Sequence, residues 1–225
     1  LLTAAFAYPI MNLESNFPEH PMKFLALGDS YTIGESVLQA ERWPVQLADL
    51  LNARGIETAP PDIIAKTGWT TDELMEGIIR GTPMPPYDLV SLLIGVNNQY
   101  RGYPPEVYRE EFATLLEQAI DFAGGDPDRV IVLSIPDWGV TPFGANDARG
   151  RTPAQISAEI ALFNTINREE TLRLEAHYVD ITPISEEAKN DLTLLAPDHL
   201  HPSGKMYAQW AEQALPIVLE ILSRP

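Results

Sequence analysis

Residues 23–30 read KFLALGDS, a compact apolar run that ends in Gly28-Asp29-Ser30. An apolar run bounded by turn-forming residues predicts a buried strand over Lys23–Leu27 that stops where a turn begins. Residues 88–95 read DLVSLLIG, and this near-continuous apolar order is typical of a strand covered on both faces, as in parallel sheets. The sequence therefore predicts two buried strands, the second of them central in its sheet.

Further strands and helices alternate along the rest of the chain. Short apolar runs predict strands over residues 63–65, 129–135 and 177–181, and periodic apolar positions predict helices over about 43–54, 70–81, 104–123, 153–175 and 203–222. Alternation of this kind implies right-handed crossovers, and so predicts a three-layer α/β/α sandwich with a five-stranded parallel sheet. Residues 136–152 lack periodicity and predict a long loop, which in compact domains tends to be functional.

Composition restricts the class of protein. The 225 residues are 45% hydrophobic and 21% charged, as in one soluble globular domain. A net charge of -17 repels phosphate backbones and anionic membrane surfaces, which argues against nucleic acid as a partner. The absence of cysteine excludes disulfides and thiolate chemistry, and no apolar run reaches the roughly 20 residues of a membrane span. Oligomeric state is left open.

The start of the chain has two interpretations. Residues 1–21 form either an N-terminal extension or the remnant of a signal peptide, and residues 22–225 form the domain. Leu1–Ala7 resembles the end of a secretory signal, whereas Met22 directly opens the first strand pattern. The protein is expected to be cytoplasmic if Met22 is the native start and exported if residues 1–7 end a signal peptide.

The candidate nucleophile and its base follow from the predicted sheet. Ligands of a doubly wound sheet bind outside the carboxyl ends of its strands, and Ser30 directly follows the first strand. A serine hydroxyl needs an adjacent imidazole that a carboxylate orients. Asp198 and His201 precede the last helix, and their spacing lets the carboxylate fold back onto Nδ1 of the ring. His199 is a rival base, but the three-residue offset favours His201.

Three groups could stabilise the oxyanion that attack on an ester creates. They are the backbone N–H of Ser30, the backbone N–H of Gly68 after the second strand, and the side-chain amide of Asn97 after the third. Position 68 suits glycine because a residue without Cβ lets the backbone approach the substrate. The sequence therefore predicts an oxyanion hole at the same rim as the nucleophile.

Aromatic residues near the strand ends are candidates for binding substrate. Trp69, Tyr100 and Trp138 could line the pocket, with ordinary packing as the alternative, and Trp69 is favoured because it follows Gly68. No His, Asp and Glu residues cluster at coordinating spacing, so neither a metal nor a cofactor is expected.

Four separated stretches resemble the sequence blocks of SGNH (GDSL-like) hydrolases, in the same order and over about residues 22–222. They are GDSY at 28–31, Gly68, GVNN at 95–98 and DHLHP at 198–202. The resemblance implies the flavodoxin-like SGNH fold, Ser30 as nucleophile, an oxyanion hole of Ser30, Gly68 and Asn97, and a His201–Asp198 pair. The third block usually reads Gly-x-Asn-Asp, and Asn98 stands in its last place. Because Asn97 is kept, we predict that activity survives.

These residues together predict a metal-independent serine esterase that cleaves short-chain carboxylic esters through an acyl-enzyme intermediate. The expected partner is a small-molecule ester, an acetylated sugar among them. Carbohydrate O-deacetylation, thioesterase or lysophospholipase activity, and a catalytically silent module that binds acetylated glycans are the alternatives, since fold does not fix substrate.

Overall fold

The computed structural model describes residues 20–223. The extension predicted over residues 1–21 therefore lies outside the described residues, apart from its last two. Met22 is fully buried, and its backbone pairs with a neighbouring segment: its N–H donates to the Glu57 carbonyl (2.7 Å), and its carbonyl accepts from the N–H of Ala59 (3.0 Å). Met22 thus belongs to the folded domain.

Five parallel strands form a single sheet in the order β2-β1-β3-β4-β5. Their bounds are β1 Phe24–Gly28, β2 Asp62–Ala65, β3 Leu89–Leu93, β4 Val130–Leu133 and β5 His177–Val179. In the register of the central strands, Leu25 lies opposite Asp62 on one side and Val90 on the other. Every residue of β1 and β3 is buried, as the two apolar runs predicted, and every residue of β4 is buried as well.

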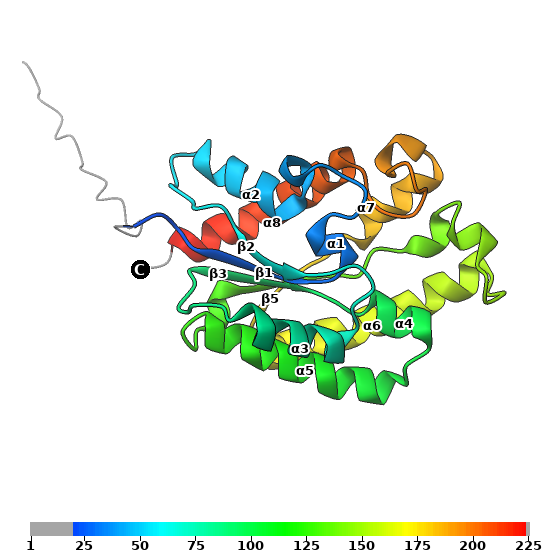
Figure 1. The fold of residues 1–225 in the computed structure, drawn as a ribbon, viewed down its shortest axis with the longest axis horizontal. Coiled ribbons are helices and arrows are strands. Elements are labelled where there is room, and N and C mark those ends of the chain that lie inside the picture. The colour runs from blue at the N-terminus through cyan, green and yellow to red at the C-terminus, as the bar shows by residue number, and fades with distance from the viewer. Residues whose placement is uncertain (1–19, 224–225) are drawn as a thin grey trace, which may run out of the picture.

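Helices cover both faces of the sheet (Figure 1). The helices are α1 Ser30–Ile33, α2 Trp43–Asn52, α3 Thr71–Gly81, α4 Val96–Arg101, α5 Pro105–Phe122, α6 Pro153–Arg173, α7 Thr182–Glu186 and α8 Gly204–Ser223. Helices α2 and α8 pack together on one face, while α5 packs between α3 and α6 on the other. The three-layer α/β/α sandwich predicted from the alternation of elements is confirmed.

The helices bury the stripes of apolar residues that predicted them, with one exception. Trp43 and Leu47 of α2 are fully buried, as are Phe112 and Leu115 of α5. In α3, which covers the edge strand β2, Leu74 and Ile78 are buried, but the apolar side chain of Ile79 is 74% exposed. Successive helical residues point about 100° apart, and α3 buries a stripe too narrow to include it.

Two regions contain short structure that the apolar pattern did not predict. The loop over residues 136–152 holds 3₁₀ turns at Trp138–Val140 and Gly144–Asn146, and residues 182–197 hold α7 with two further 3₁₀ turns, Glu187–Lys189 and Leu192–Leu194. Such turns arise from local hydrogen bonds, such as the one that Asp137 Oδ1 accepts from the N–H of Gly139 (2.8 Å). Local hydrogen bonds of this kind do not require a regular spacing of apolar residues, so the apolar pattern does not predict them.

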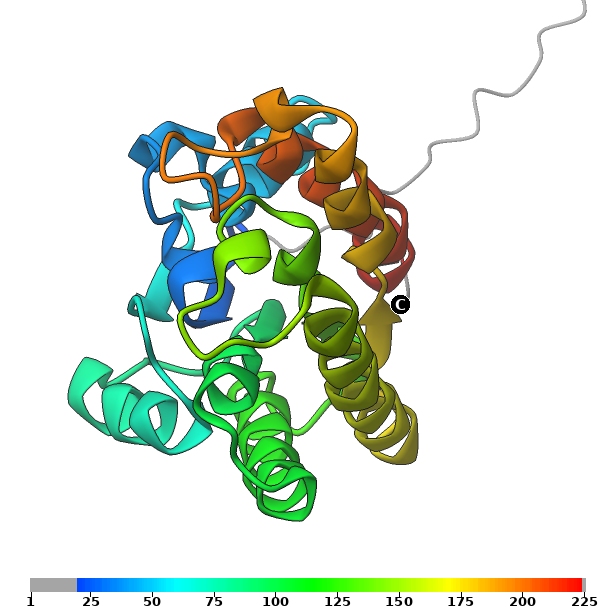
Figure 2. The same ribbon diagram turned by 90° about the vertical axis from the view of Figure 1, so that its right-hand side faces the viewer.

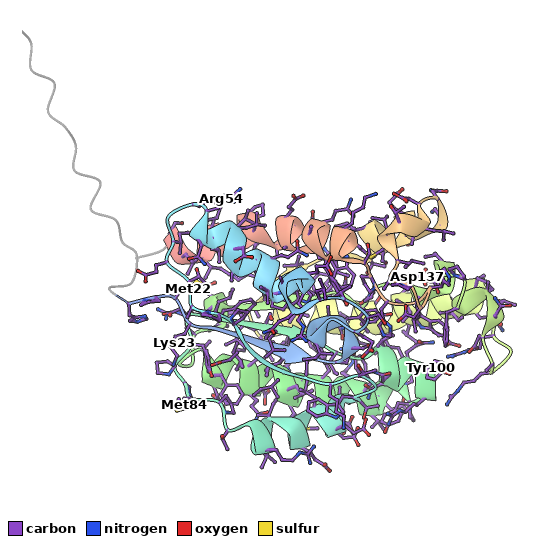
Figure 3. All side chains as sticks on the ribbon, turned by 45° about the horizontal axis from the view of Figure 1, so that its top comes forward. Met22, Lys23, Arg54, Met84, Tyr100 and Asp137 are labelled. Atoms are coloured by element: carbon purple, nitrogen blue, oxygen red, sulfur yellow. The ribbon has the colours of Figure 1, made fainter. Side chains whose placement is uncertain are left out.

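The loops that could form a site gather at one end of the sheet. Figure 3 shows Tyr100 and Asp137 at the carboxyl ends of the strands, with Met22, Lys23 and Met84 at the opposite end. In Figure 2 the segment 136–152 lies at the front of this carboxyl end. Within residues 20–223, no helix combines the length and hydropathy needed to cross a bilayer.

Candidate active site

Ser30 is the first residue of α1 and follows β1 after a very tight turn. Its relative exposure is 5%. A Cβ at Gly28 would lie 2.2 Å from Oγ1 of Thr32 and 2.4 Å from the carbonyl oxygen of Leu93, so only glycine allows β1, β3 and α1 to approach this closely. As the first residue of a helix, Ser30 has an N–H that takes no part in the helical hydrogen bonds.

Asp29 is a fully buried carboxyl group next to Ser30. Burial raises the pKa of Asp29 to about 7, against the opposing effect of the hydrogen bond that Oδ1 accepts from the N–H of Tyr31 (3.0 Å). Its second oxygen, Oδ2, has no hydrogen-bond partner among residues 20–223. The residue thus caps α1 while carrying a proton readily at neutral pH.

Asp198 and His201 form a local pair in the turn before α8. Nδ1 of His201 lies 2.7 Å from Oδ2 of Asp198, and Oδ1 accepts the N–H groups of Leu200 (3.0 Å) and His201 (2.9 Å). Because a carboxylate only accepts, the proton of the ring sits on Nδ1, which leaves Nε2 as a base. His199 is exposed, and Asp198 pairs with His201 instead.

The charged form of Asp198 is strongly favoured. Partial burial raises the pKa of Asp198, but the hydrogen bonds from His201, from the Ser36 hydroxyl and from the backbone outweigh it and lower that pKa to about 2. The carboxylate therefore stays ionised at any pH near neutrality.

Gly68 occupies a turn that α4 holds in place. The N–H of Trp69 donates to the carbonyl of Lys66 (3.2 Å), which closes a four-residue turn. Its third residue, Gly68, has φ +88°, the positive value that a type II turn requires at this position. The turn itself does not use the N–H of Gly68. Nδ2 of Asn97 donates to the Trp69 carbonyl (2.9 Å), and one helical turn later Nη2 of Arg101 donates to the Gly68 carbonyl (2.6 Å).

Asn98 is fully buried and joins three helices. Its Oδ1 accepts the N–H of Thr71 at the start of α3 (3.1 Å), and its Nδ2 donates to the Thr71 hydroxyl (2.6 Å). That hydroxyl in turn donates to the carboxylate of Glu111 in α5. The side chain that replaces the usual aspartate thus supports the loop around Asn97 without facing the cavity.

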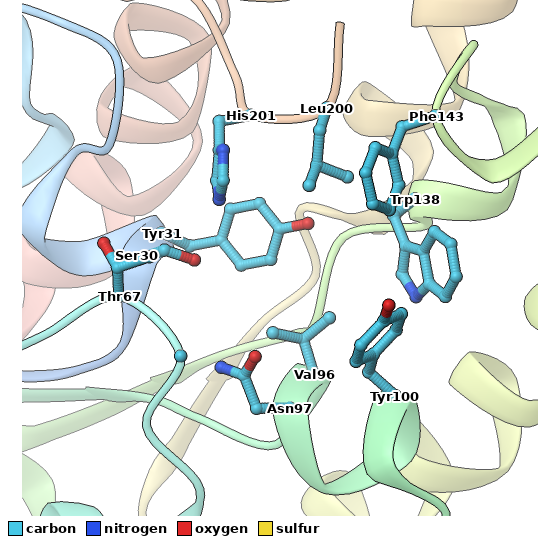
Figure 4. A pocket seen from close by; sticks show the side chains of 11 residues that line it. Ser30, Tyr31, Thr67, Val96, Asn97, Tyr100, Trp138, Phe143, Leu200 and His201 are labelled. Atoms are coloured by element: carbon cyan, nitrogen blue, oxygen red, sulfur yellow. The ribbon is translucent and has the colours of Figure 1, made fainter. Parts of the chain in front are cut away.

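A cavity of about 200 Å³ brings the separate segments together (Figure 4). Ser30, Gly68, Asn97 and His201 border one end, and the His201 ring reaches down toward Ser30. The remaining lining residues are Tyr31, Thr67, Val96, Tyr100, Trp138, Phe143 and Leu200. One end of the cavity is therefore polar, and the other is aromatic and aliphatic.

The three aromatic candidates differ in whether their side chains line the cavity. Tyr100 and Trp138 line the cavity with their rings 5.6 Å apart, and Nε1 of Trp138 donates to the buried Gln99 (2.9 Å). Trp69 does not line it. Its indole packs on Gly77 of α3, where a Cβ would lie 2.2 Å from the ring. Trp69 lies just before α3, so its side chain packs on that helix and points away from the cavity. Its backbone carbonyl accepts the hydrogen bond from Asn97.

Sequence reasoning missed Tyr31, Thr67, Val96 and Leu200 as lining residues. Each is the direct neighbour of a candidate site residue, which was the available signal, but adjacency alone does not tell which way a side chain points. Within the part of the chain that the structure describes, no three His, Asp or Glu side chains are grouped as metal ligands would be.

Comparisons with known proteins agree with this fold. Residues 26–209 match the GDSL-like Lipase/Acylhydrolase family. Similar solved structures include TesA (TM-score 0.68, 16% identity, 89% of this chain and 99% of that one) and the psychrotrophic esterase EstA from Pseudoalteromonas sp. (TM-score 0.67, 16% identity, 90% and 99%). Axe2, an acetylxylan esterase from Geobacillus stearothermophilus, is also similar (TM-score 0.66, 18% identity, 88% and 94%). No curated protein sequence matches the chain. The chain belongs to the GDSL-like lipase/acylhydrolase family of carboxylic ester hydrolases.

Proposed function

We propose that this enzyme is a serine esterase that hydrolyses short-chain carboxylic esters, with Ser30 as nucleophile, His201 as base and Asp198 as its orienting carboxylate. One observation carries the proposal. The Asp198–His201 pair, with 2.7 Å between Oδ2 and Nδ1, stands at the polar end of the cavity that Ser30 and Asn97 also border.

Acylation starts with attack of the Ser30 hydroxyl oxygen on the ester carbonyl carbon. Nε2 of His201 takes the hydroxyl proton, and the carbonyl π electrons move onto the oxygen. Asp198, charged at any pH near neutrality, stabilises the imidazolium that forms. When the tetrahedral intermediate collapses, His201 gives the proton to the leaving alkoxide, and Ser30 keeps the acyl group.

The oxyanion is stabilised by donors that are already in place. The N–H groups of Ser30 and Gly68 are free of helix and turn hydrogen bonds, and Asn97 has a second hydrogen on Nδ2 besides the one given to the Trp69 carbonyl. Removal of one such donor typically costs about 3 kcal/mol in the barrier. In deacylation, water attacks the acyl group, His201 takes its proton, and Ser30 leaves with that proton.

The size of the cavity supports a short acyl group. Its volume of about 200 Å³ is below the roughly 300–1,000 Å³ of sites that enclose drug-sized ligands. Trp138, itself only 2% exposed, forms a wall at the apolar end, together with Tyr100 and Phe143. A long acyl chain would have to displace these rings or leave the cavity.

The test compares the protein with its Ser30→Ala variant on p-nitrophenyl esters of increasing acyl length. Hydrolysis of the acetyl ester should be fastest in the wild type and should fall by roughly 10⁴-fold or more in Ser30→Ala. Ser223→Ala, an exposed serine at the end of α8, is the control and should keep full activity.

Labelling identifies the nucleophile independently. A phosphonate ester should add to Ser30 alone, as peptide mass spectrometry would show. Full turnover by Ser30→Ala, or an adduct at another serine, would refute the assignment. Acetylated xylose, an acyl thioester and a lysophospholipid tested beside the p-nitrophenyl esters distinguish among the other substrate classes.

A further inference from the structure

A short segment after α1 connects the candidate nucleophile to the rest of the site. We name residues 34–37 the strap. The N–H groups of Gly34 and Glu35 both donate to the carbonyl of Ser30, at 3.1 and 3.0 Å, and the N–H of Val37 donates to the carbonyl of Gly34 (3.4 Å). The strap is therefore built directly on the peptide group of Ser30.

Ser36 reaches from the strap to the orienting carboxylate. Its hydroxyl donates to Oδ2 of Asp198 at 2.7 Å, and His201 Nδ1 contacts the same oxygen, also at 2.7 Å. The two N–H donors to the other oxygen belong to the turn that contains Asp198. Ser36 is thus the donor that comes from a distant part of the sequence, 162 positions away.

The backbone of Ser36 is in the left-handed region, with φ 65°. A residue with a Cβ adopts this conformation at a cost in free energy, which persists only where surrounding contacts dictate it. The neighbouring Glu35 accepts a hydrogen bond from the hydroxyl of Thr67, the residue before Gly68. Three consecutive residues of the strap therefore contact Ser30, the turn that contains Gly68, and the carboxylate of Asp198.

We propose that Ser36 is a positioning residue, which fixes the Asp198–His201 pair relative to Ser30. The inference rests on the proposed function. Without the hydroxyl, the turn of residues 198–201 would hold Asp198 only through its own N–H groups. Its carboxylate could then rotate, and the His201 ring would follow it away from Ser30. Small misplacements of reacting groups lower rates steeply, because catalysis depends on their alignment.

The variant Ser36→Gly separates positioning from a merely structural role. Glycine removes the hydroxyl and also removes the strain of the left-handed backbone, so the Tm should stay equal or rise. We expect kcat on p-nitrophenyl acetate to fall about tenfold while KM stays within about twofold. Ser36→Ala should show the same loss of kcat with a lower Tm than Ser36→Gly.

Thr82→Gly is the matched control. Thr82 caps the C-terminus of α3, directly after Gly81, with φ 43°. It lies outside the residues that border the cavity, so glycine relieves the same kind of strain there. Its Tm should rise or stay equal with wild-type kcat. If Ser36→Gly also has wild-type kcat, or if its loss of kcat is accompanied by an equal loss of folded protein, the positioning role is overturned.

The rate of phosphonylation tests the same step without turnover. The rate constant for adduct formation at Ser30 should fall in Ser36→Gly by the same factor as kcat. The NMR resonance of the proton on His201 Nδ1 should shift or broaden in Ser36→Gly and stay unchanged in Thr82→Gly. Labelling of Ser36→Gly at the wild-type rate contradicts the role of Ser36, whereas failure to label Ser30 in the wild type contradicts the proposed function instead.

Discussion

Asn98 stands where related enzymes usually carry aspartate, and its surroundings explain the amide. The Thr71 hydroxyl has a single hydrogen, which it donates to Glu111. The hydroxyl oxygen can therefore only accept a hydrogen bond from residue 98, and Nδ2 of Asn98 donates that hydrogen bond at 2.6 Å. An aspartate would place a second carboxylate against a hydroxyl whose hydrogen is already used.

The Asn98→Asp variant should therefore be less stable. We expect a loss of about 1–3 kcal/mol in the free energy of unfolding, the cost of leaving a buried group without its partner. Glu111→Gln should restore part of it, because a glutamine amide can donate to Thr71 and free that hydroxyl to donate to the carboxylate introduced at position 98. Thermal unfolding of a double-mutant cycle measures this coupling. Glu110→Gln on the exposed side of α5 should restore nothing.

Asp29 should make stability depend on pH. Its pKa is about 7 in the folded protein and about 3.8 without burial. Between these values the folded protein keeps the proton that the unfolded chain has released, so the stability that this group contributes is complete below pH 4 and is lost as pH rises through 7. Asp198, with its lowered pKa, acts in the opposite sense and only in acid, as pH falls through about 2.

The measurement is the Tm of wild type and Asp29→Asn at intervals between pH 4 and pH 8. The Tm of the wild type should fall by several degrees relative to that of the variant over this range. Asp121→Asn, an exposed carboxylate at the end of α5, should follow the wild type. Parallel curves for wild type and Asp29→Asn would show that the buried carboxyl does not titrate in this range.

At the scale of elements, two segments shape the cavity. Helix α4 positions Asn97 and Arg101 one turn apart, so that consecutive carbonyls of the Gly68 turn are both bound. The 136–152 segment supplies Trp138 and Phe143, and it is anchored where the N–H of Phe143 donates to the carbonyl of His199 (3.4 Å). The helix holds the polar end, and the loop closes the apolar end.

Phe143→Ala should widen the acyl preference. Phe143 is 41% exposed, so its removal should change Tm little while opening the wall of the cavity. The ratio of kcat/KM for p-nitrophenyl octanoate to that for the acetate should rise about tenfold, within the range that a few methylene contacts supply. Leu192→Ala, also an exposed apolar residue but outside the lining, should leave the ratio unchanged.

At the scale of the whole molecule, the net charge of -17 sets which esters approach readily. A negative field slows the encounter with anionic substrates and has little effect on neutral ones. Raising the salt concentration from about 10 mM to about 0.5 M shrinks the Debye length from about 30 Å to less than 8 Å.

The kcat/KM for an ester with a carboxylate on its alcohol should therefore rise several-fold over that range of salt. The matched neutral ester should change by less than about twofold. Stopped-flow or steady-state rates with the two esters at equal ionic strengths measure the difference. An identical salt response for both would show that local charges at the cavity outweigh the total charge.

The sequence by itself determined the order and type of the main elements and the residues of the four blocks. Buried parallel strands need continuous apolar runs, and the helices that cover them need apolar stripes, so both leave a local pattern. Position in such a sheet also brings Ser30, Gly68 and Asn97 to one end, because the carboxyl ends of parallel strands share an edge.

The tertiary structure decided which side chains face the cavity and which support it. Trp69 packs on α3, Ile79 faces solvent, and Ser36 contacts Asp198 across 162 positions of sequence. None of these follows from a local pattern. Each depends on the direction in which a side chain points after distant segments have packed together. Contacts between distant segments produce no regular pattern of residues in the sequence, so the sequence does not predict them.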